Sequence, residues 1–264
     1  MQSLLGAADP LDRFYAAWAL TSIEGRKSDL TIEIARAYSG LGYSEIEIDI
    51  ATDYLSDLGS DAADALPVII LGLMGLDDFL SSGPTDVLGK TGHRGIPAVP
   101  ALLHQVSRLS SDQFEVVDER AANALESIAG DLRNRDELSE PLERAIGCRV
   151  SGSKQQSSCH LVAELTNAIR ALEAWLDHPD LSMRLGAMAG LGFFGPAAIP
   201  ALDHLCSFFS SDTPEERLHA AVACRQIGGD EKLYEEITAL ALDQSRVSAA
   251  MREWVQQVLF DKDS

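Results

Sequence analysis

The chain has few basic residues for its length. Its 264 residues include 21 Lys and Arg against 41 Asp and Glu, which gives a formal net charge of −20. A protein of this charge is repelled by nucleic-acid phosphates and by anionic membranes, so neither is expected as a partner. Two interpretations stay open: a surface suited to a basic protein partner, and a charge that serves only solubility.

Long apolar runs and paired cysteines are also absent. The longest apolar run, residues 66–76, is much shorter than the roughly 20 residues that cross a bilayer. The first residues lack the basic region of a signal peptide. None of the four cysteines forms a CxxC pair, and free thiols are expected for Cys148 and Cys159, although these two could bridge if oxidised. We therefore expect a cytoplasmic protein.

The motifs of common catalytic and metal sites are missing too. The six histidines form no HxxxH or HExxH pattern, and there is no GxSxG. The segment 90–95, Lys-Thr-Gly-His-Arg-Gly, superficially suggests a phosphate-binding loop but lacks its spacing. The sequence therefore assigns no catalytic, cofactor-binding or metal-binding residue.

Helical periodicity is what the sequence offers instead. Apolar spacing, N-caps and glycine stops predict helices in most of the chain. The predicted helices begin near Pro10 and Ser28 and otherwise cover 44–59, 61–80, 115–129, 137–146, 161–176, 183–195, 201–209, 215–227, 231–242 and 247–260. The glycine-rich segment 81–95 is predicted to be a loop, and the polar segment 149–158 a mobile loop. Trp18, at helical spacing from other apolar residues, is expected in the core.

The helices recur with a period of 33 residues. Arg184, Leu185, Ala187 and Gly195 are repeated 33 positions later as Arg217, Leu218, Ala220 and Gly228. Pro67 likewise lies 33 residues before Pro100. Residues 92–112 also match residues 192–212 at eleven of 21 positions, a shift of 100 that is close to three periods. A helical hairpin of about 33 residues is therefore the predicted unit.

The segment 44–59 shows two periodicities. Residues 45–50 alternate as in a strand, but the apolar positions up to Leu58 lie on one helical face. Ser44 and Glu47 match a capping box and Gly59 a helix stop, so we predict a helix.

Four acidic residues follow one another at intervals of four along this predicted helix. They are Glu45, Asp49, Asp53 and Asp57. Like charges at this spacing destabilise a helix by about 0.2–0.5 kcal/mol per pair, and no Lys or Arg occurs between Arg36 and Lys90. The stripe is either a solvated or ion-paired face, or the docking face for a cationic partner. It is the candidate site that the sequence provides.

Two entry motifs and one helix motif carry a family resemblance. Asp177-His178-Pro179 and Asp212-Thr213-Pro214 each precede an arginine, and residues 198–202 read Ala-Ile-Pro-Ala-Leu. In these motifs the chain resembles HEAT repeats, most closely the short repeats of the phycobilisome-lyase type. The resemblance covers residues 177–243 well and residues 60–131 in part.

The resemblance implies an all-α fold, an α-solenoid of about seven helical hairpins with one row of helices lining a concave face. We expect one domain, 1–264. Its predicted parts are an N-terminal cap (1–43), a first repeat block (44–148), the loop 149–158 and a second repeat block (159–264).

Three functions are compatible with these observations. The first is a non-catalytic adaptor or regulator that docks a basic protein on the acidic helices. The second is an inhibitor or immunity protein that covers a basic, nuclease-like toxin. The third, implied by the resemblance alone, is a bilin-lyase-like enzyme or a chaperone of chromophore attachment.

Overall fold

The protein is described by a computed structural model for residues 2–24, 28–39, 43–75, 82–108, 115–135 and 166–228. Within these ranges it is built of helices and contains no strand, which confirms the all-α class. The first half contains η1 (Gln2–Gly6), α1 (Pro10–Glu24), α2 (Ser28–Ala35), η2 (Arg36–Ser39), α3 (Glu45–Leu58), η3 (Gly59–Ala65), α4 (Leu66–Gly75), α5 (Ser82–Lys90), η4 (Gly92–Ala98), α6 (Val99–Arg108) and α7 (Glu115–Asn134). The second half contains α10 (Thr166–Trp175), α11 (Leu181–Phe193), η5 (Gly195–Ala201), α12 (Leu202–Ser207), η6 (Phe208–Ser210) and α13 (Pro214–Ile227).

A left-handed glycine closes the first helix of successive units. Gly59, Gly92, Gly195 and Gly228 have φ angles of 57°, 58°, 56° and 106°, which side chains with a Cβ rarely adopt. Gly92 follows Gly59 by 33 residues, and Gly228 follows Gly195 by 33. After the first three of these glycines the chain forms a short 3₁₀ helix and then the second helix of the unit. The predicted period is therefore present in the backbone.

The same glycines correct the long-range alignment made from the sequence. η4 reads Gly-His-Arg-Gly-Ile-Pro-Ala and η5 reads Gly-Pro-Ala-Ala-Ile-Pro-Ala, with Gly92 and Gly195 as their first residues. Equivalent positions are thus 103 residues apart, and the shift of 100 is wrong by three residues. The error arose because Gly92 and Gly95, Pro97 and Pro100, and Gly192 and Gly195 are each three residues apart, so that identities alone fit two registers.

The prediction of a loop at residues 81–95 is also wrong. Residues 82–90 form the helix α5, which takes the first-helix position of its unit between α3 and α7. Its glycines allow close packing instead of breaking the helix. A Cβ on Gly83 would lie 2.4 Å from Thr52 Oγ1, and one on Gly89 would lie 3.2 Å from Ala124 Cα. Pro84 lies in the first turn, where the missing N–H has no helical partner in any case.

Most long-range polar contacts connect residues about one unit apart. Arg184 Nε donates a hydrogen bond to Glu216 at 2.6 Å, and Gln105 Nε2 donates one to the Leu73 carbonyl at 2.8 Å. The Tyr15 hydroxyl donates a hydrogen bond to Glu47. In each of these pairs the two residues are 32 positions apart. Side chains therefore bond one helical unit to the next at these three places in the described chain.

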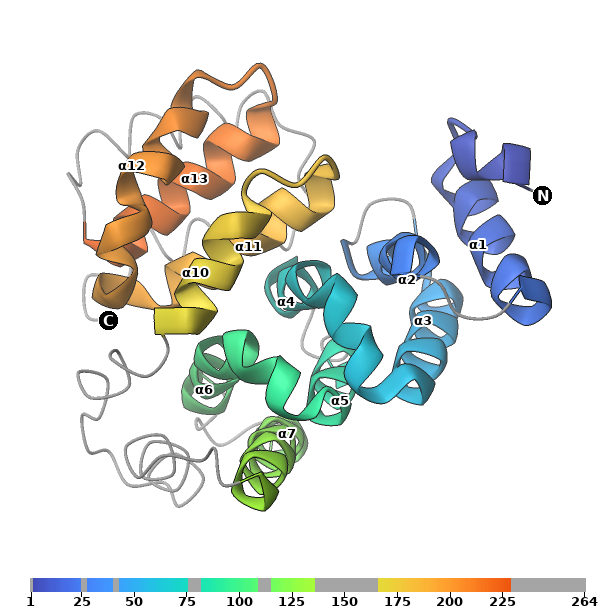
Figure 1. Ribbon diagram of the computed structural model, residues 1–264, viewed down its shortest axis with the longest axis horizontal. Helices are drawn as coiled ribbons and strands as arrows, with labels where there is room; N and C mark the ends of the chain where they lie inside the picture. Colours follow the sequence, from blue (N-terminus) through green and yellow to red (C-terminus); the bar gives the residue numbers. More distant parts are fainter. Residues whose placement is uncertain are drawn as a thin grey trace.

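The second half of the chain lies against the first at α4. This helix has no polar side chain, and all of its residues from Leu66 to Met74 are buried. A helix that is apolar all round must be covered on every side. The helices α2, α5 and η3 cover part of α4, and α11 lies along it (Figure 1). The row of second helices is thus covered at α4, whereas the helices α3, α5 and α7, here called the outer row, each carry exposed residues.

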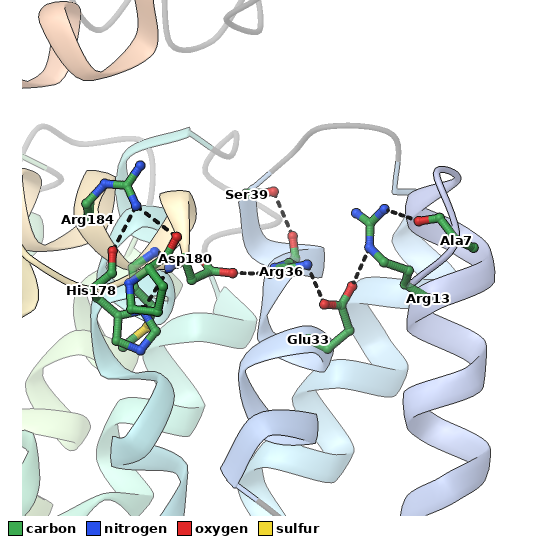
Figure 2. A network of polar contacts seen from close by, with 10 residues as sticks. Ala7, Arg13, Glu33, Arg36, Ser39, His178, Asp180 and Arg184 are labelled. Atoms are coloured by element: carbon green, nitrogen blue, oxygen red, sulfur yellow. Dashed lines mark hydrogen bonds and ion pairs between the residues drawn. The ribbon is translucent and has the colours of Figure 1, made fainter. Parts of the chain in front are cut away.

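An ionic network joins the two halves beside this contact. Arg36 forms ion pairs with both Glu33, on its own side, and Asp180, the N-cap of α11 (Figure 2). Arg13 Nε bonds the same Glu33 at 3.0 Å. The carboxylate side chains of Glu33 and Asp180 are each only 11% exposed, so their charges depend on these arginines.

Several sequence predictions concern residues outside the described ranges. These are the helices at 137–146, 231–242 and 247–260, the loop 149–158, and the pair Cys148 and Cys159. The predicted division into 1–43, 44–148 and 159–264 stays a prediction.

The contact between α4 and α11 leads to a first testable prediction. A Cβ on Gly186 would lie 1.9 Å from the Pro67 carbonyl oxygen, which is backbone and cannot turn away. We expect Gly186→Ala to lower the free energy of unfolding by about 3 kcal/mol, measured by urea denaturation. Gly130→Ala in α7 is the matched control, because a Cβ there meets nothing within 4 Å. The control should stabilise the protein by about 0.5–1 kcal/mol, and equal effects of the two variants would contradict this packing.

A buried histidine in α13 leads to a second prediction, on pH. Burial lowers the pKa of His219 to about 4, and nearby Glu215 opposes this effect. Between pH 6.5 and 4 the unfolded chain therefore binds a proton at this residue that the folded chain does not, so stability is lost as pH falls through that window. At pH 5 the loss should be about 2 kcal/mol relative to pH 7.5. His219→Leu should reduce the dependence of the free energy of unfolding on pH between pH 6.5 and 4. An unchanged dependence would show that another group is responsible.

Candidate functional site

The four acidic residues of the candidate site lie where the sequence placed them. Residues Glu45–Leu58 form α3, and Glu45, Asp49, Asp53 and Asp57 are all exposed along it. We call these four residues the acidic stripe. The strand alternative for residues 45–50 is thereby excluded.

The start of α3 is fixed by the predicted capping box. The backbone N–H of Ser44 donates to Glu47 Oε2 at 2.8 Å, and the Ser44 hydroxyl donates to the same oxygen. The hydroxyl of Tyr15 in α1 donates to Glu47 Oε1. These bonds from Ser44 and Tyr15 lower the pKa of Glu47 to about 2. Glu47 is thus a buried structural anion, in contrast with the exposed carboxylates around it.

No arginine from elsewhere in the described residues neutralises the first three members of the stripe. Glu45, Asp49 and Asp53 form no ion pair there, whereas two arginines of neighbouring elements are bound to other carboxylates. Arg94 pairs with Asp64 at 2.6 Å, and Arg120 pairs with Asp86 at 3.1 Å. The ion-paired alternative for the stripe therefore fails for these three residues.

A polar cavity of about 430 Å³ lies beside the stripe, between α3, α5 and α7. Asp53 is the only member of the stripe that lines it. The other lining residues are Thr52, Ser56, Thr85, Asp86, Gly89, Lys90, Arg120, Asn123, Ala124 and Ser127. Its charged side chains carry both signs, so the cavity by itself selects no charged ligand.

The structure adds exposed apolar side chains that sequence reasoning placed in the core or did not single out. Trp18 is 43% exposed, which corrects its expected place in the core, and Tyr15 and Ile46 are 40% and 64% exposed. The apolar residues of α1 lie on more than one face of the helix. Phe14 is fully buried, whereas its neighbour Tyr15 is exposed. Adjacent aromatic residues were the sequence signal that part of this apolar surface lies outside the core, since a helix with a single buried face does not need them.

Metal ligands and reactive thiols are not brought together in the described part of the chain. No group of three or more His, Cys, Asp or Glu side chains there could hold a metal ion. Cys206 and Cys224 are free thiols with their sulfur atoms 3.9 Å apart, between α12 and α13. Burial raises the pKa of the Cys224 thiol, so it is not an activated nucleophile.

Comparisons with known proteins do not identify a family. No protein-family model matches the chain, and no curated protein matches its sequence. Among solved structures, one similar chain is an engineered protein from a structural genomics consortium, at 16% identity and a TM-score of 0.29 over 97% of this chain and 92% of that one. A likeness at that level carries no functional argument. Among the described helices, none is long and apolar enough to cross a membrane.

The acidic stripe leads to a third prediction, on stability. Asp49→Lys replaces repulsion from Glu45 and Asp53 by attraction, so we expect the free energy of unfolding to rise by about 1 kcal/mol at low salt. Asp49→Asn, which only removes the repulsion, should give about half of this gain. Both gains should shrink in 1 M NaCl, where exposed charges are screened. Destabilisation by both variants would show that Asp49 has a favourable partner in the folded protein.

Proposed function

We propose that this chain is a HEAT-like α-solenoid of about seven hairpins that works as a non-catalytic interaction module in the cytoplasm. In this proposal it docks a basic protein partner on α3, at the acidic stripe. The 33-residue spacing of the left-handed glycines and the polar contacts between successive units support the solenoid. The sequence motifs at 177–202 support its HEAT-like character.

The unneutralised part of the stripe is the observation that carries the function. Glu45, Asp49 and Asp53 are exposed, lie on one helix and repel one another, at a cost in helix stability. A partner with lysines or arginines facing them would turn this repulsion into attraction. The net charge of −20 would add long-range steering, which raises the rate of association and discriminates against acidic proteins.

A narrower form of the proposal is an inhibitor that covers the basic active site of a nuclease-like protein. The same net charge favours it, because nucleases bind a polyanion and therefore present a basic surface. The two forms share the docking face and differ only in the identity of the partner.

The test is affinity capture from native lysate with three baits. These are the wild type, the stripe variant Asp49→Lys/Asp53→Lys, and the control Glu119→Lys/Glu126→Lys, which makes the same charge change at exposed residues of α7. We expect a basic protein to be recovered with the wild type and the control but not with the stripe variant. The purified partner should then bind the wild type with an affinity that falls steeply between 50 and 300 mM NaCl. Equal recovery with the stripe variant would reject the docking face.

A further inference from the structure

Exposed apolar side chains are concentrated in the first elements of the described chain. Among the described residues, six large apolar side chains are exposed, and five of them belong to η1, α1 or the first turn of α3. The five are Leu4, Tyr15, Trp18, Ile23 and Ile46, and the sixth is Ile199 in η5. Such clustering of apolar surface marks an interaction site more often than scattered exposure does.

Ile46 lies on the same helix as the acidic stripe, and Tyr15 and Trp18 are connected to that helix through a hydrogen bond of Tyr15. The bond from the Tyr15 hydroxyl to Glu47 places the Tyr15 ring against the first turn of α3, the turn that carries Ile46 and Glu45. The Trp18 ring meets the Tyr15 ring edge to face, with centroids 6.5 Å apart. The hydrogen bond to Glu47 holds Tyr15 in place, so the aromatic pair is ordered before any partner arrives.

We propose that Tyr15, Trp18 and Ile46 form the apolar anchor of the docking face, and that its occupant is an amphipathic basic helix of the partner protein. This inference rests on the proposed function and specifies the chemistry of the partner. Apolar side chains of the helix would pack on Trp18 and Ile46, while its lysines or arginines would meet Glu45, Asp49 and Asp53. Buried aromatic anchors supply most of the binding energy in such interfaces, and the charges mainly set rate and specificity.

Charge decides between this occupant and a second copy of the chain. Two copies facing each other through this surface would bring their acidic stripes together, and each carries a net charge of −20. A basic segment without apolar residues would match the stripe but leave the aromatic pair in water. An amphipathic basic helix satisfies both parts of the surface.

The probes are two synthetic helical peptides with equal numbers of lysines. One carries leucines along a single face, and in the other every leucine is replaced by serine. We expect the leucine peptide to bind the wild type about tenfold more tightly in isothermal titration calorimetry at 50 mM NaCl. Trp18→Ala/Ile46→Ser should remove this advantage and leave the serine peptide unaffected. Asp49→Asn/Asp53→Asn should weaken both peptides.

Ile199→Ser is the matched control, because it removes an exposed apolar side chain far from the stripe, and it should change neither affinity. If the variant Trp18→Ala/Ile46→Ser still binds the leucine peptide about tenfold more tightly than the serine peptide, the anchor is overturned, while the acidic docking face stands. Failure of both peptides to bind the wild type rejects the proposed function itself. Self-association of the wild type in sedimentation, abolished by Trp18→Ala/Ile46→Ser, would assign the surface to a second copy and overturn the basic occupant.

Discussion

The close approach of α11 to α4 is the contact on which the arrangement of the described helices depends. At Gly186 the two helices come so near that the Pro67 carbonyl occupies the place of a side chain. The contact covers an apolar helix that would otherwise expose isoleucine, valine and leucine to water. Burial of that surface, at roughly 25 cal/mol per Å², is the driving force that brings the second half of the chain onto the first.

Charge has two separate uses in this molecule. The carboxylates of Glu33, Glu47, Asp180 and Glu216 are largely buried and receive hydrogen bonds from arginines, hydroxyls or backbone N–H groups. They fix helix starts and join neighbouring units, so they serve the fold itself. The acidic stripe is exposed, and its first three members have no cationic partner in the described residues. Its charges repel one another and destabilise the isolated chain, and they become favourable only when they face a basic surface.

The packing of α11 on α4 also explains why the candidate site lies on the outer row. The row of second helices is covered at α4 by α11 of the same chain. The outer row keeps the stripe and the cavity beside Asp53, and the exposed rings of Tyr15 and Trp18 lie on α1, which is bonded to α3 through Tyr15 and Glu47. Recognition through this row would use side chains that the fold does not need for its core.

Local signals in the sequence were sufficient for helix α3 and for the 33-residue period. The capping box at Ser44 and Glu47, the stop at Gly59 and the recurrence of Gly195 at Gly228 act over a few residues or one unit, so they could be interpreted without a structure. They also sufficed to place the acidic stripe on one helical face. A spacing of four residues means the same thing on any exposed helix.

Tertiary structure decided what depends on neighbours distant in sequence. The glycines of Ser82–Lys90 predict a loop by propensity, yet they form a helix because Thr52 and Ala124 pack against the backbone there. Trp18 has the spacing of a core residue, but no helix of the described chain buries it. The position of α11 depends on α4, more than 100 residues earlier, and on the ion pair between Arg36 and Asp180. Sequence patterns report which residues are apolar and how they are spaced, whereas only packing decides which apolar faces find a partner within the chain and which remain open to another molecule.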